Sequence, residues 1–449
     1  MTTDGDADGG EDEGGDHDSE GADAEERHVV TVFLRNAGEV LLLRRSDEVG
    51  TYAGLWGGVS GYAEGDPDAA ARWEIDEETG LGDAVTLVRR GDPVAFTDGT
   101  LGIDWVVHPF LFDCPERAVE PNEEVRETTW VPPTVIPRGE AVPELWTAYD
   151  RVRPTVESVA ADTEHGSAYL SLRALEVLRD EAGRRAAGHG TDREPEGPDG
   201  WDAVAATARE LLDARPSMTA LTNRVNRAMT DADEETTAAV ERAAHAGIGR
   251  ALDADQEASA AAAARVASET VLTLSRSGTV ERALSSTPSG PNRVYVAESR
   301  PAREGVGVAE RLASEGVAVT VVTDAAVAHV LAERAIDRVV IGADTVLPDG
   351  SVRNKTGTRG AAITAANEDI PVDAVTATDK VATAATVAGE TGPREAVYDG
   401  DAAVDVENPT FDHTPAAFVT GVVTERGVLD ADQVAAVADE YRALSAWRE

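Results

Sequence analysis

The sequence of 449 residues contains one cysteine, Cys114, and only two lysines, Lys355 and Lys380. A single cysteine excludes an internal disulfide and any zinc site built from several cysteines. The eight histidines are scattered along the chain without the spacing of metal ligands. No run of about 18 apolar residues occurs and no signal peptide opens the chain, so we expect a soluble, cytoplasmic protein with no membrane partner.

Positive charge is also scarce, because 84 Asp and Glu residues face 40 Lys and Arg residues and give a formal net charge of −44. The acids accompany apolar-patterned segments throughout, which argues against disorder. Such a protein repels phosphates, so nucleic acid is not expected as a direct partner. The acid excess, the few lysines and the abundant Ala and Val resemble proteins of salt-accumulating halophilic archaea, in which salt screens repulsion between acids.

The pattern along the chain predicts an α/β protein with several domains. Residues 1–27 have almost nothing apolar and are expected to form a disordered acidic tail. Residues 28–143 predict short strands around one central helix. Residues 146–266 predict helices, with a linker or loop at 183–200 that is rich in Gly and Pro. Residues 267–449 alternate β-branched runs with Ala-rich helices, which indicates a doubly wound parallel sheet.

The stretch WEIDEETGL, residues 73–81, holds four acids in nine positions. On a helix, Glu74, Glu77 and Glu78 share one face, where their charges repel unless a cation lies between them. Mg²⁺ binds through a few carboxylates and leaves its other positions to water and substrate phosphates. In so acidic a chain the acids alone recur by chance. The accompanying glycines and apolar positions make the pattern specific.

Together with Gly58 and Glu64, this stretch resembles the Nudix box, G-x5-E-x7-R-E-U-x-E-E-x-G-U, where U is apolar. One extra residue separates the two halves, and Trp73 stands where the family has an arginine that usually orients a carboxylate. The resemblance implies a Nudix fold that hydrolyses a pyrophosphate linkage of the nucleoside-diphosphate type.

The same resemblance assigns roles to the acids. Glu74, Glu77 and Glu78 are implied as ligands of Mg²⁺, or alternatively of Mn²⁺, with Glu64 as an auxiliary ligand. The general base is expected from the box or from the adjacent Glu123 and Glu124. Those last two also fit a plain role as surface acids.

A second informative stretch is IGADTVLPDGSVRNKTGTRGA, residues 341–361. A strand ends in Gly-Ala-Asp, and NKTGT opens a helix, which makes a good phosphate cradle. Both lysines fall at such strand ends, Lys355 in NKTGT and Lys380 in TDK. In a chain that otherwise uses arginine, this placement suggests that a compact ammonium group is needed there.

From about residue 150 onward the chain resembles the initiation-factor-2B α/β/δ subunits and the related sugar-phosphate isomerases. The likeness rests on HGSAYLSLRALEVL, LLDARPSMTALTNRVNRAM, VLTLSRSGTVERAL, ESRPAREG and NPTFDHTP, in that order. It implies a helical subdomain, a Rossmann-like domain and homo-oligomers formed through this part. The isomerases use a Cys and an Asp, for which this chain has Ser275 and Asp344. A serine hydroxyl is a far weaker acid than a thiol.

The resemblance also implies a set of groups that bind phosphate or sugar. Helix capping by Ser275 and Ser277, and buried ion pairs of Arg215 and Arg300, are the plain structural alternatives. The implied binding residues are Gly166, Ser167, Arg215, Ser277, Gly278, Thr279, Asn354, Lys355 and Lys380.

Three functions follow from these observations. The first is a Nudix hydrolase joined to a regulatory domain that binds a sugar phosphate or nucleotide. The second is a bifunctional enzyme that also isomerises ribose 1,5-bisphosphate or a related aldose 1-phosphate. The third is a non-catalytic module like a translation factor subunit. Ser275 favours the first function over the second, and the three carboxylates of the box favour it over the third.

Overall fold

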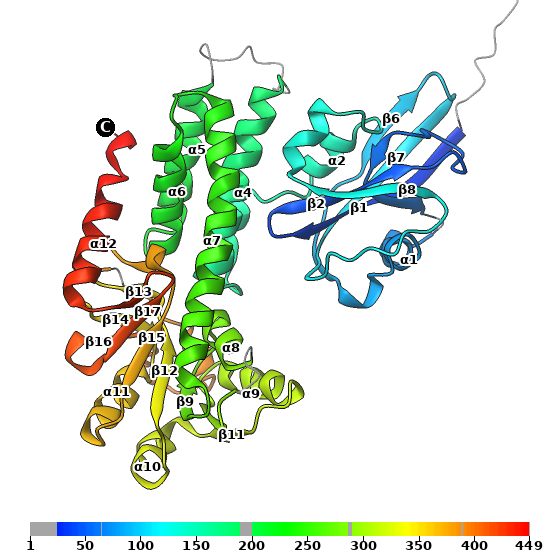
Figure 1. Ribbon diagram of the computed structural model, residues 1–449. Coiled ribbons are helices and arrows are strands. Elements are labelled where there is room, and N and C mark those ends of the chain that lie inside the picture. The colour runs from blue at the N-terminus through cyan, green and yellow to red at the C-terminus, as the bar shows by residue number, and fades with distance from the viewer. Residues whose placement is uncertain (1–24, 64, 189–199, 286–289, 388, 449) are drawn as a thin grey trace, which may run out of the picture.

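The computed structural model describes residues 25–63, 65–188, 200–285, 290–387 and 389–448 (Figure 1). We call residues 25–152 the first domain, residues 156–266 the helical subdomain and residues 270–448 the sheet domain. Within the described residues, no helix combines the length and apolar character needed to cross a bilayer. The alternation of helices and strands confirms the predicted α/β class.

The first domain is built on an eight-stranded sheet in which β1 is central. Strand β1 pairs in parallel with β7 and antiparallel with β2 and β4. Its side chains alternate between two faces, so that Val32 packs with helix α1 and Phe33 packs with helix α2. The strands are β1 (Glu25–Asn36), β2 (Glu39–Arg45), β3 (Trp56–Gly57), β4 (Val59–Tyr62), β5 (Thr86–Arg90), β6 (Val94–Asp98), β7 (Ile103–Asp113) and β8 (Val125–Val131), and the helices are α1 (Pro67–Thr79) and α2 (Leu145–Asp150).

Three predicted boundaries differ from the structure. Residues 25–27, assigned to the tail, begin β1 because their backbones pair with β7, which needs no apolar side chain. The core of the first domain continues past residue 143 to Val152. Helix α4 extends to Ala186, into the predicted linker. The rest of the predicted tail, residues 1–24, and residues 189–199 of the linker lie outside the described residues.

The helical subdomain packs around the long helix α7, which runs beside α4 and α6 toward the sheet domain in Figure 1. Its core consists of leucine, valine and alanine side chains such as Leu175, Leu211 and Val225. The helices are α3 (Val156–Ala161), α4 (Ser167–Ala186), α5 (Trp201–Ala214), α6 (Thr219–Asp231) and α7 (Thr237–Val266).

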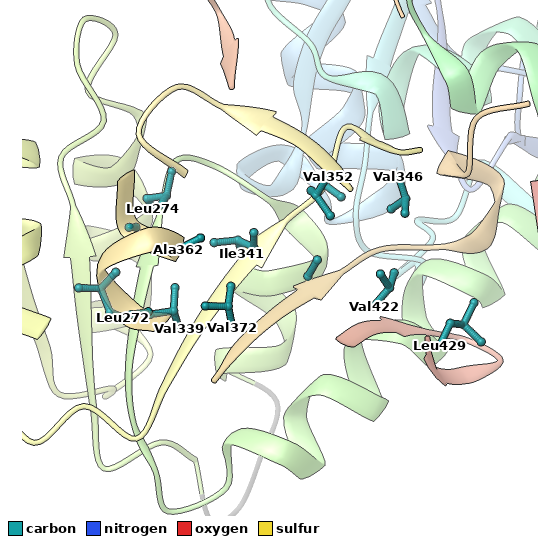
Figure 2. Packing of buried hydrophobic residues seen from close by; sticks show 14 of the residues in the cluster. Leu272, Leu274, Val339, Ile341, Val346, Val352, Ala362, Val372, Val422 and Leu429 are labelled. Carbon is teal, nitrogen blue, oxygen red and sulfur yellow. The ribbon is translucent and has the colours of Figure 1, made fainter. Parts of the chain in front are cut away.

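The sheet domain has seven strands in the order β11-β10-β9-β12-β15-β17-β18, all parallel except the last pair. Side chains alternate between two buried faces, as the predicted doubly wound sheet requires. Leu272 and Ile341 point into the cluster of Figure 2, whereas Val271 and Val340 pack on α7, α8 and α9. The strands are β9 (Thr270–Leu274), β10 (Arg293–Ala297), β11 (Val319–Val322), β12 (Arg338–Gly342), β15 (Val372–Val375), β17 (Gly421–Thr424) and β18 (Gly427–Leu429).

The chain leaves β9 in one direction, through β10 and β11, and returns to build β12 on the other side of β9. Such a switch point opens a crevice beyond the carboxyl ends of the two strands. A three-stranded antiparallel sheet follows β12, with strands β13 (Thr345–Val346), β14 (Val352–Lys355) and β16 (Phe411–Thr414). The helices are α8 (Gly278–Ser285), α9 (Glu304–Ser314), α10 (Val327–Glu333), α11 (Thr358–Asn367) and α12 (Ala431–Ala443).

The first domain lies beside helix α4 in Figure 1, and buried charged side chains make the contact between them. Arg35 of β1 lies 3.2 Å from Glu176 of α4, and both side chains are almost completely buried. The Arg35 guanidinium also donates to the Tyr169 hydroxyl at 2.9 Å. In the β1–β2 turn, the carbonyl of Gly38 accepts from Arg179. The turn is therefore seated on α4 by polar contacts.

Candidate functional site

Helix α1 carries the acidic stretch and has well-defined ends. The Asp66 side chain caps the first turn by accepting from the Asp68 amide, and Gly80 ends the helix with a left-handed φ of 68°. Glu74 and Glu78 are 8% and 4% exposed, although they are carboxylates in a very acidic chain. Burial separates these two acids from an ordinary acidic surface.

Strand β4 brings its backbone close to both buried acids. A Cβ atom at Gly61 would lie 1.7 Å from Oε1 of Glu74, so this position requires glycine. The backbone amide of Ser60 donates to Oε2 of Glu78 at 3.0 Å. Glu77, one turn from Glu74, is exposed and faces the same cavity.

Burial and neighbouring carboxylates raise the pKa values of the two buried acids. Burial, together with the charges of Glu77 and Glu124, raises the pKa of Glu74 to about 7. Burial is the main reason that the pKa of Glu78 rises to about 8. The hydrogen bond from the Ser60 amide lowers this pKa, the charge of Glu74 raises it, and the charge of Arg45 lowers it. A cation among these groups would relieve both burial and repulsion.

These acids supply the hard oxygen donors that Mg²⁺ prefers. Their crowding and their raised pKa values fit a cation site, so the donor chemistry suits the group that the resemblance implies. Among the described residues, however, no three His, Cys, Asp or Glu side chains form a ready-made metal site. Glu64, the implied auxiliary ligand, lies outside the described residues.

A cavity of about 300 Å³ opens beside the acidic helix. Its wall combines acids with apolar and aromatic side chains, as expected for a site that takes a ligand with both a charged and a flat apolar part. The lining includes Arg45, Tyr52, Gly57, Gly58, Ser60, Gly61, Tyr62, Trp73, Glu74, Glu77, Phe96, Trp105 and Glu124.

Neither Trp73, which stands at the arginine position of the Nudix box, nor the adjacent Arg72 brings a guanidinium to the acids of α1. The Trp73 side chain is 61% exposed and lies at the cavity. Arg72 points elsewhere, with its guanidinium carbon 5.5 Å from the centre of the Phe112 ring. Of the two loop acids, Glu124 lines the cavity, and Glu123 is not among the lining residues.

A second cavity, of about 580 Å³, lies at the switch point of the sheet domain and extends to the start of α4. All the residues implied to bind phosphate or sugar line it, together with Ser275 and Asp344. They are Gly166, Ser167, Arg215, Ser275, Ser277, Gly278, Thr279, Asp344, Asn354, Lys355 and Lys380.

This second cavity is richer in positive charge than the rest of the chain. Seven cationic and seven acidic residues line it, whereas acids outnumber cations about two to one in the sequence. Both lysines of the chain are among the seven cations. An anionic ligand would therefore be favoured here over other parts of the molecule.

Ser275 directly follows β9 and lies in the left-handed region with a φ of 63°. Its amide donates to the Ser299 hydroxyl at 2.7 Å, which fixes the turn. Ser277 lies against Gly342 at the end of β12, where a Cβ atom would lie 2.7 Å from the Ser277 Cβ. The Ser277 hydroxyl is 3.5 Å from the Val280 amide, a long contact that makes it a weak helix cap.

Asp344 follows β12 and faces the same cavity. Burial raises its pKa, whereas the nearby Lys380 and Lys355 lower it. The ammonium of Lys380 donates to the carbonyl of Ala343 at 3.0 Å, and that of Lys355 lies 2.7 Å from a carboxylate oxygen of Glu304. Asp344 is therefore a buried acid with a raised pKa near two lysines.

Arg215 and Asn354 are held by neighbouring groups. The Arg215 guanidinium donates to the carbonyls of Val159 and Asp162, so it supports the loop before α4. It has no ion-pair partner among the described residues, in contrast to the buried ion pair that is the structural alternative. Asn354 donates to the Thr358 hydroxyl at 3.0 Å. Arg300, the other arginine of that alternative, is exposed.

Sequence reasoning missed several residues of these cavities. Arg45 and Ser60 reach the acidic helix from β2 and β4, and Glu304 pairs with Lys355 from α9. Their chain positions carry no motif. The pair Arg44-Arg45 at the end of an apolar run was the one visible signal near the first cavity.

Known proteins resemble this chain in two blocks. The Initiation factor 2 subunit family matches residues 163–431, and the NUDIX domain matches residues 25–152. A ribose 1,5-bisphosphate isomerase of Haloferax volcanii is 29% identical over 309 residues, which cover 62% of this chain and 90% of that protein. A ribose 1,5-bisphosphate isomerase of Haloterrigena turkmenica is 30% identical over 315 residues, which cover 64% of this chain and 92% of the relative.

Solved structures support the fold of the second block. The crystal structure of 5-methylthioribose 1-phosphate isomerase from Pyrococcus horikoshii OT3 superposes with a TM-score of 0.52 at 19% identity, covering 72% of this chain and 90% of the other. At that identity the likeness concerns the fold alone. Since the first family match spans more than half of the residues, the chain belongs to the Initiation factor 2 subunit family and carries a Nudix domain before that block.

Proposed function

We propose that the Nudix domain hydrolyses a pyrophosphate linkage of the nucleoside-diphosphate type with Mg²⁺ held by Glu74, Glu77 and Glu78. The sheet domain binds a phosphorylated sugar or nucleotide in the larger cavity and regulates the chain. One observation carries the proposal: two buried carboxylates on α1 lie against the backbone of β4 with raised pKa values.

The residues of the chain prepare both halves of this reaction. When bound, Mg²⁺ neutralises charge on a pyrophosphate and lowers the pKa of water. With pKa values of about 7 and about 8, Glu74 and Glu78 hold protons near neutral pH and must release them to bind the cation. Glu124, which lines the same cavity, is the proposed acceptor of a proton from water.

The aromatic wall of the first cavity supports a nucleoside as part of the substrate. Tyr52 and Trp105 have ring centres 6.2 Å apart, and Phe96 lines the same wall. The Tyr52 hydroxyl donates to Asp98 at 2.7 Å, which fixes its ring. Flat apolar surfaces of this kind bind a base, while the acids at the other end take the cation and the phosphates.

The test compares Glu77→Gln with Asp76→Asn, its exposed neighbour on the same helix. Release of phosphate or nucleoside monophosphate is measured with a panel of nucleotides and nucleotide sugars, with Mg²⁺ and in molar KCl. We expect Glu77→Gln to abolish turnover and Asp76→Asn to retain it, with unfolding midpoints almost unchanged. Unaltered turnover in Glu77→Gln would show that these acids have no role in catalysis, and the hydrolase proposal would be wrong.

Isomerisation is a second candidate for the sheet domain. The position of Asp344 favours it, because an acid with a raised pKa beside Lys355 and Lys380 suits proton transfer to a sugar phosphate. The two relatives from Haloferax volcanii and Haloterrigena turkmenica are ribose 1,5-bisphosphate isomerases by name. Against it stands Ser275, a weaker acid than the thiol of the isomerases.

Incubation with ribose 1,5-bisphosphate separates the two candidates for this domain. We expect binding without rapid formation of the ketose in NMR spectra. Rapid conversion by the wild type that is lost in Asp344→Asn would establish a bifunctional enzyme. We also propose that the chain self-associates through the sheet domain. Light scattering coupled to size-exclusion chromatography of the full-length protein measures the mass of the oligomer.

A further inference from the structure

Arg45 brings a guanidinium to the acidic helix, although it comes from a different element. It is the last residue of β2, and the pairing of β2 with β8 shifts register between Arg44 and Arg45. Arg44 pairs with Glu127 and Arg45 with Val125, so the extra residue of this bulge, Arg126, belongs to β8. Successive side chains of β2 point to opposite faces of the sheet, which separates Arg45 from Arg44. Arg45 accordingly lines the cavity that holds Glu74 and Glu77, whereas Arg44 does not.

Hydrogen bonds fix the Arg45 guanidinium in place. Its Nε donates to the carbonyl of Thr51 at 3.0 Å, and its Nη1 donates to the Ser60 hydroxyl at 3.1 Å. The Ser60 amide in turn donates to Oε2 of Glu78 at 3.0 Å. A single residue, Ser60, thus joins the guanidinium to a buried carboxylate that is 33 residues away from Arg45 in the sequence.

We infer that Arg45 is a positioning residue that orients Glu78 for cation binding through Ser60, while Trp73 leaves α1 without a guanidinium at that position. This inference rests on the proposed hydrolase function. Ligand carboxylates are themselves held by hydrogen bonds, and removing such a partner lowers metal affinity by about 10- to 100-fold. Arg45 acts through Ser60 and is not itself a ligand.

Arg44 provides a matched control for the arginine. It holds the same loop as Arg45, since its Nε donates to the carbonyl of Gly54 at 3.1 Å. Its guanidinium lies over the Trp56 ring and 3.7 Å from the Glu127 carboxylate, and Arg44 does not line the cavity of the acidic helix. A loss of loop support alone would therefore affect Arg44→Met and Arg45→Met alike.

The experiment measures Mn²⁺ binding to the full-length protein by electron paramagnetic resonance, in molar KCl and without substrate. The relevant site is the one that disappears in Glu78→Gln. We expect Arg45→Met to weaken binding at this site by about ten-fold or more, and Arg44→Met to leave it unchanged. Arg45→Lys, which keeps the charge but loses the planar fork, should fall between the two.

A second variant keeps the test decisive if Arg45→Met fails to fold. Ser60→Ala removes the hydroxyl that Arg45 contacts but keeps the amide that Glu78 accepts from, and it should also weaken Mn²⁺ binding. If Arg45→Met or Ser60→Ala bound Mn²⁺ as tightly as Arg44→Met does, the inference would be overturned. The proposed hydrolase function would still stand. A rise in KM with unchanged Mn²⁺ affinity would also overturn it, because Arg45 would then contact the substrate.

Failure of the hydrolase itself gives a different result. If the wild type has no Mn²⁺ site that Glu78→Gln removes, the proposed function and this inference fall together. A site that is present in the wild type, lost in Glu78→Gln and weakened in Arg45→Met supports both. Restored affinity when Trp73→Arg is added to Arg45→Met would further support the orienting role, since α1 would then carry its own guanidinium.

Discussion

Replacing Glu78 with glutamine should stabilise the metal-free protein at alkaline pH although it destroys the proposed cation site. Burial raises the pKa of Glu78 from its ordinary 4.5 to about 8. Between these values the folded state keeps a proton that the unfolded state has lost, so stability falls by roughly 1.4 kcal/mol per pH unit. The contribution is fully present below pH 4.5 and is lost as pH rises through 8.

The loss of stability summed between pH 4.5 and pH 8 gives the expected difference between the variant and the wild type. A shift of about 3.5 pH units corresponds to a loss of roughly 4 kcal/mol by pH 8. Glutamine carries no charge at any pH, and its side-chain oxygen can still accept from the Ser60 amide. The variant should therefore lack this loss, and its free energy of unfolding should exceed that of the wild type at pH 8 by up to that amount.

Urea unfolding at pH 5.5 and pH 8, with EDTA and fixed KCl, measures the difference. Tryptophan fluorescence mainly reports the first domain, which contains five of the seven tryptophans. Asp76→Asn, exposed on the same helix, corrects for the change in overall charge. If Glu78→Gln and Asp76→Asn show the same change in stability with pH, Glu78 ionises without cost, and the reasoning from its burial is wrong.

Three further predictions concern other positions. Trp73→Arg should change hydrolysis only modestly, as phosphate release will show, and a dead wild type revived by this change would indicate a non-catalytic natural protein. Lys355→Ala should weaken binding of ribose 1,5-bisphosphate by about ten-fold or more in calorimetry, or roughly 1.4 kcal/mol per decade, and undiminished affinity would remove Lys355 from the phosphate site. Ser275→Cys should recover some isomerisation in the NMR assay, and its activity should vanish again when Asp344→Asn is added.

The fold of the sheet domain could be predicted because its strands have a simple pattern. Buried parallel strands such as residues 338–342 read as short β-branched runs, and the helices between them fix the topology. The switch point also explains why distant residues meet. Ser275 and Asp344 follow the two neighbouring strands β9 and β12, so both border one crevice.

Local contacts made by unremarkable residues could not be predicted. The hydrogen bond from Arg45 to the Ser60 hydroxyl joins the end of β2 to β4, and no pattern in the sequence marks it. Glu304 meets Lys355 across the sheet domain, which no spacing in the sequence encodes. Residues 25–27 looked like a tail because composition says nothing of a backbone partner such as β7.

The packing of the β1–β2 turn against α4 affects which parts of the molecule unfold locally together. Arg35 and Gly38 contact α4 through Glu176, Tyr169 and Arg179, so the turn cannot lift away without breaking buried polar contacts. Local openings follow cooperative units and not the order of residues along the chain. The amides of this turn should therefore exchange with solvent deuterium as slowly as those in the middle of α4. The β1–β2 turn of the first domain and helix α4 of the helical subdomain should therefore open as one unit.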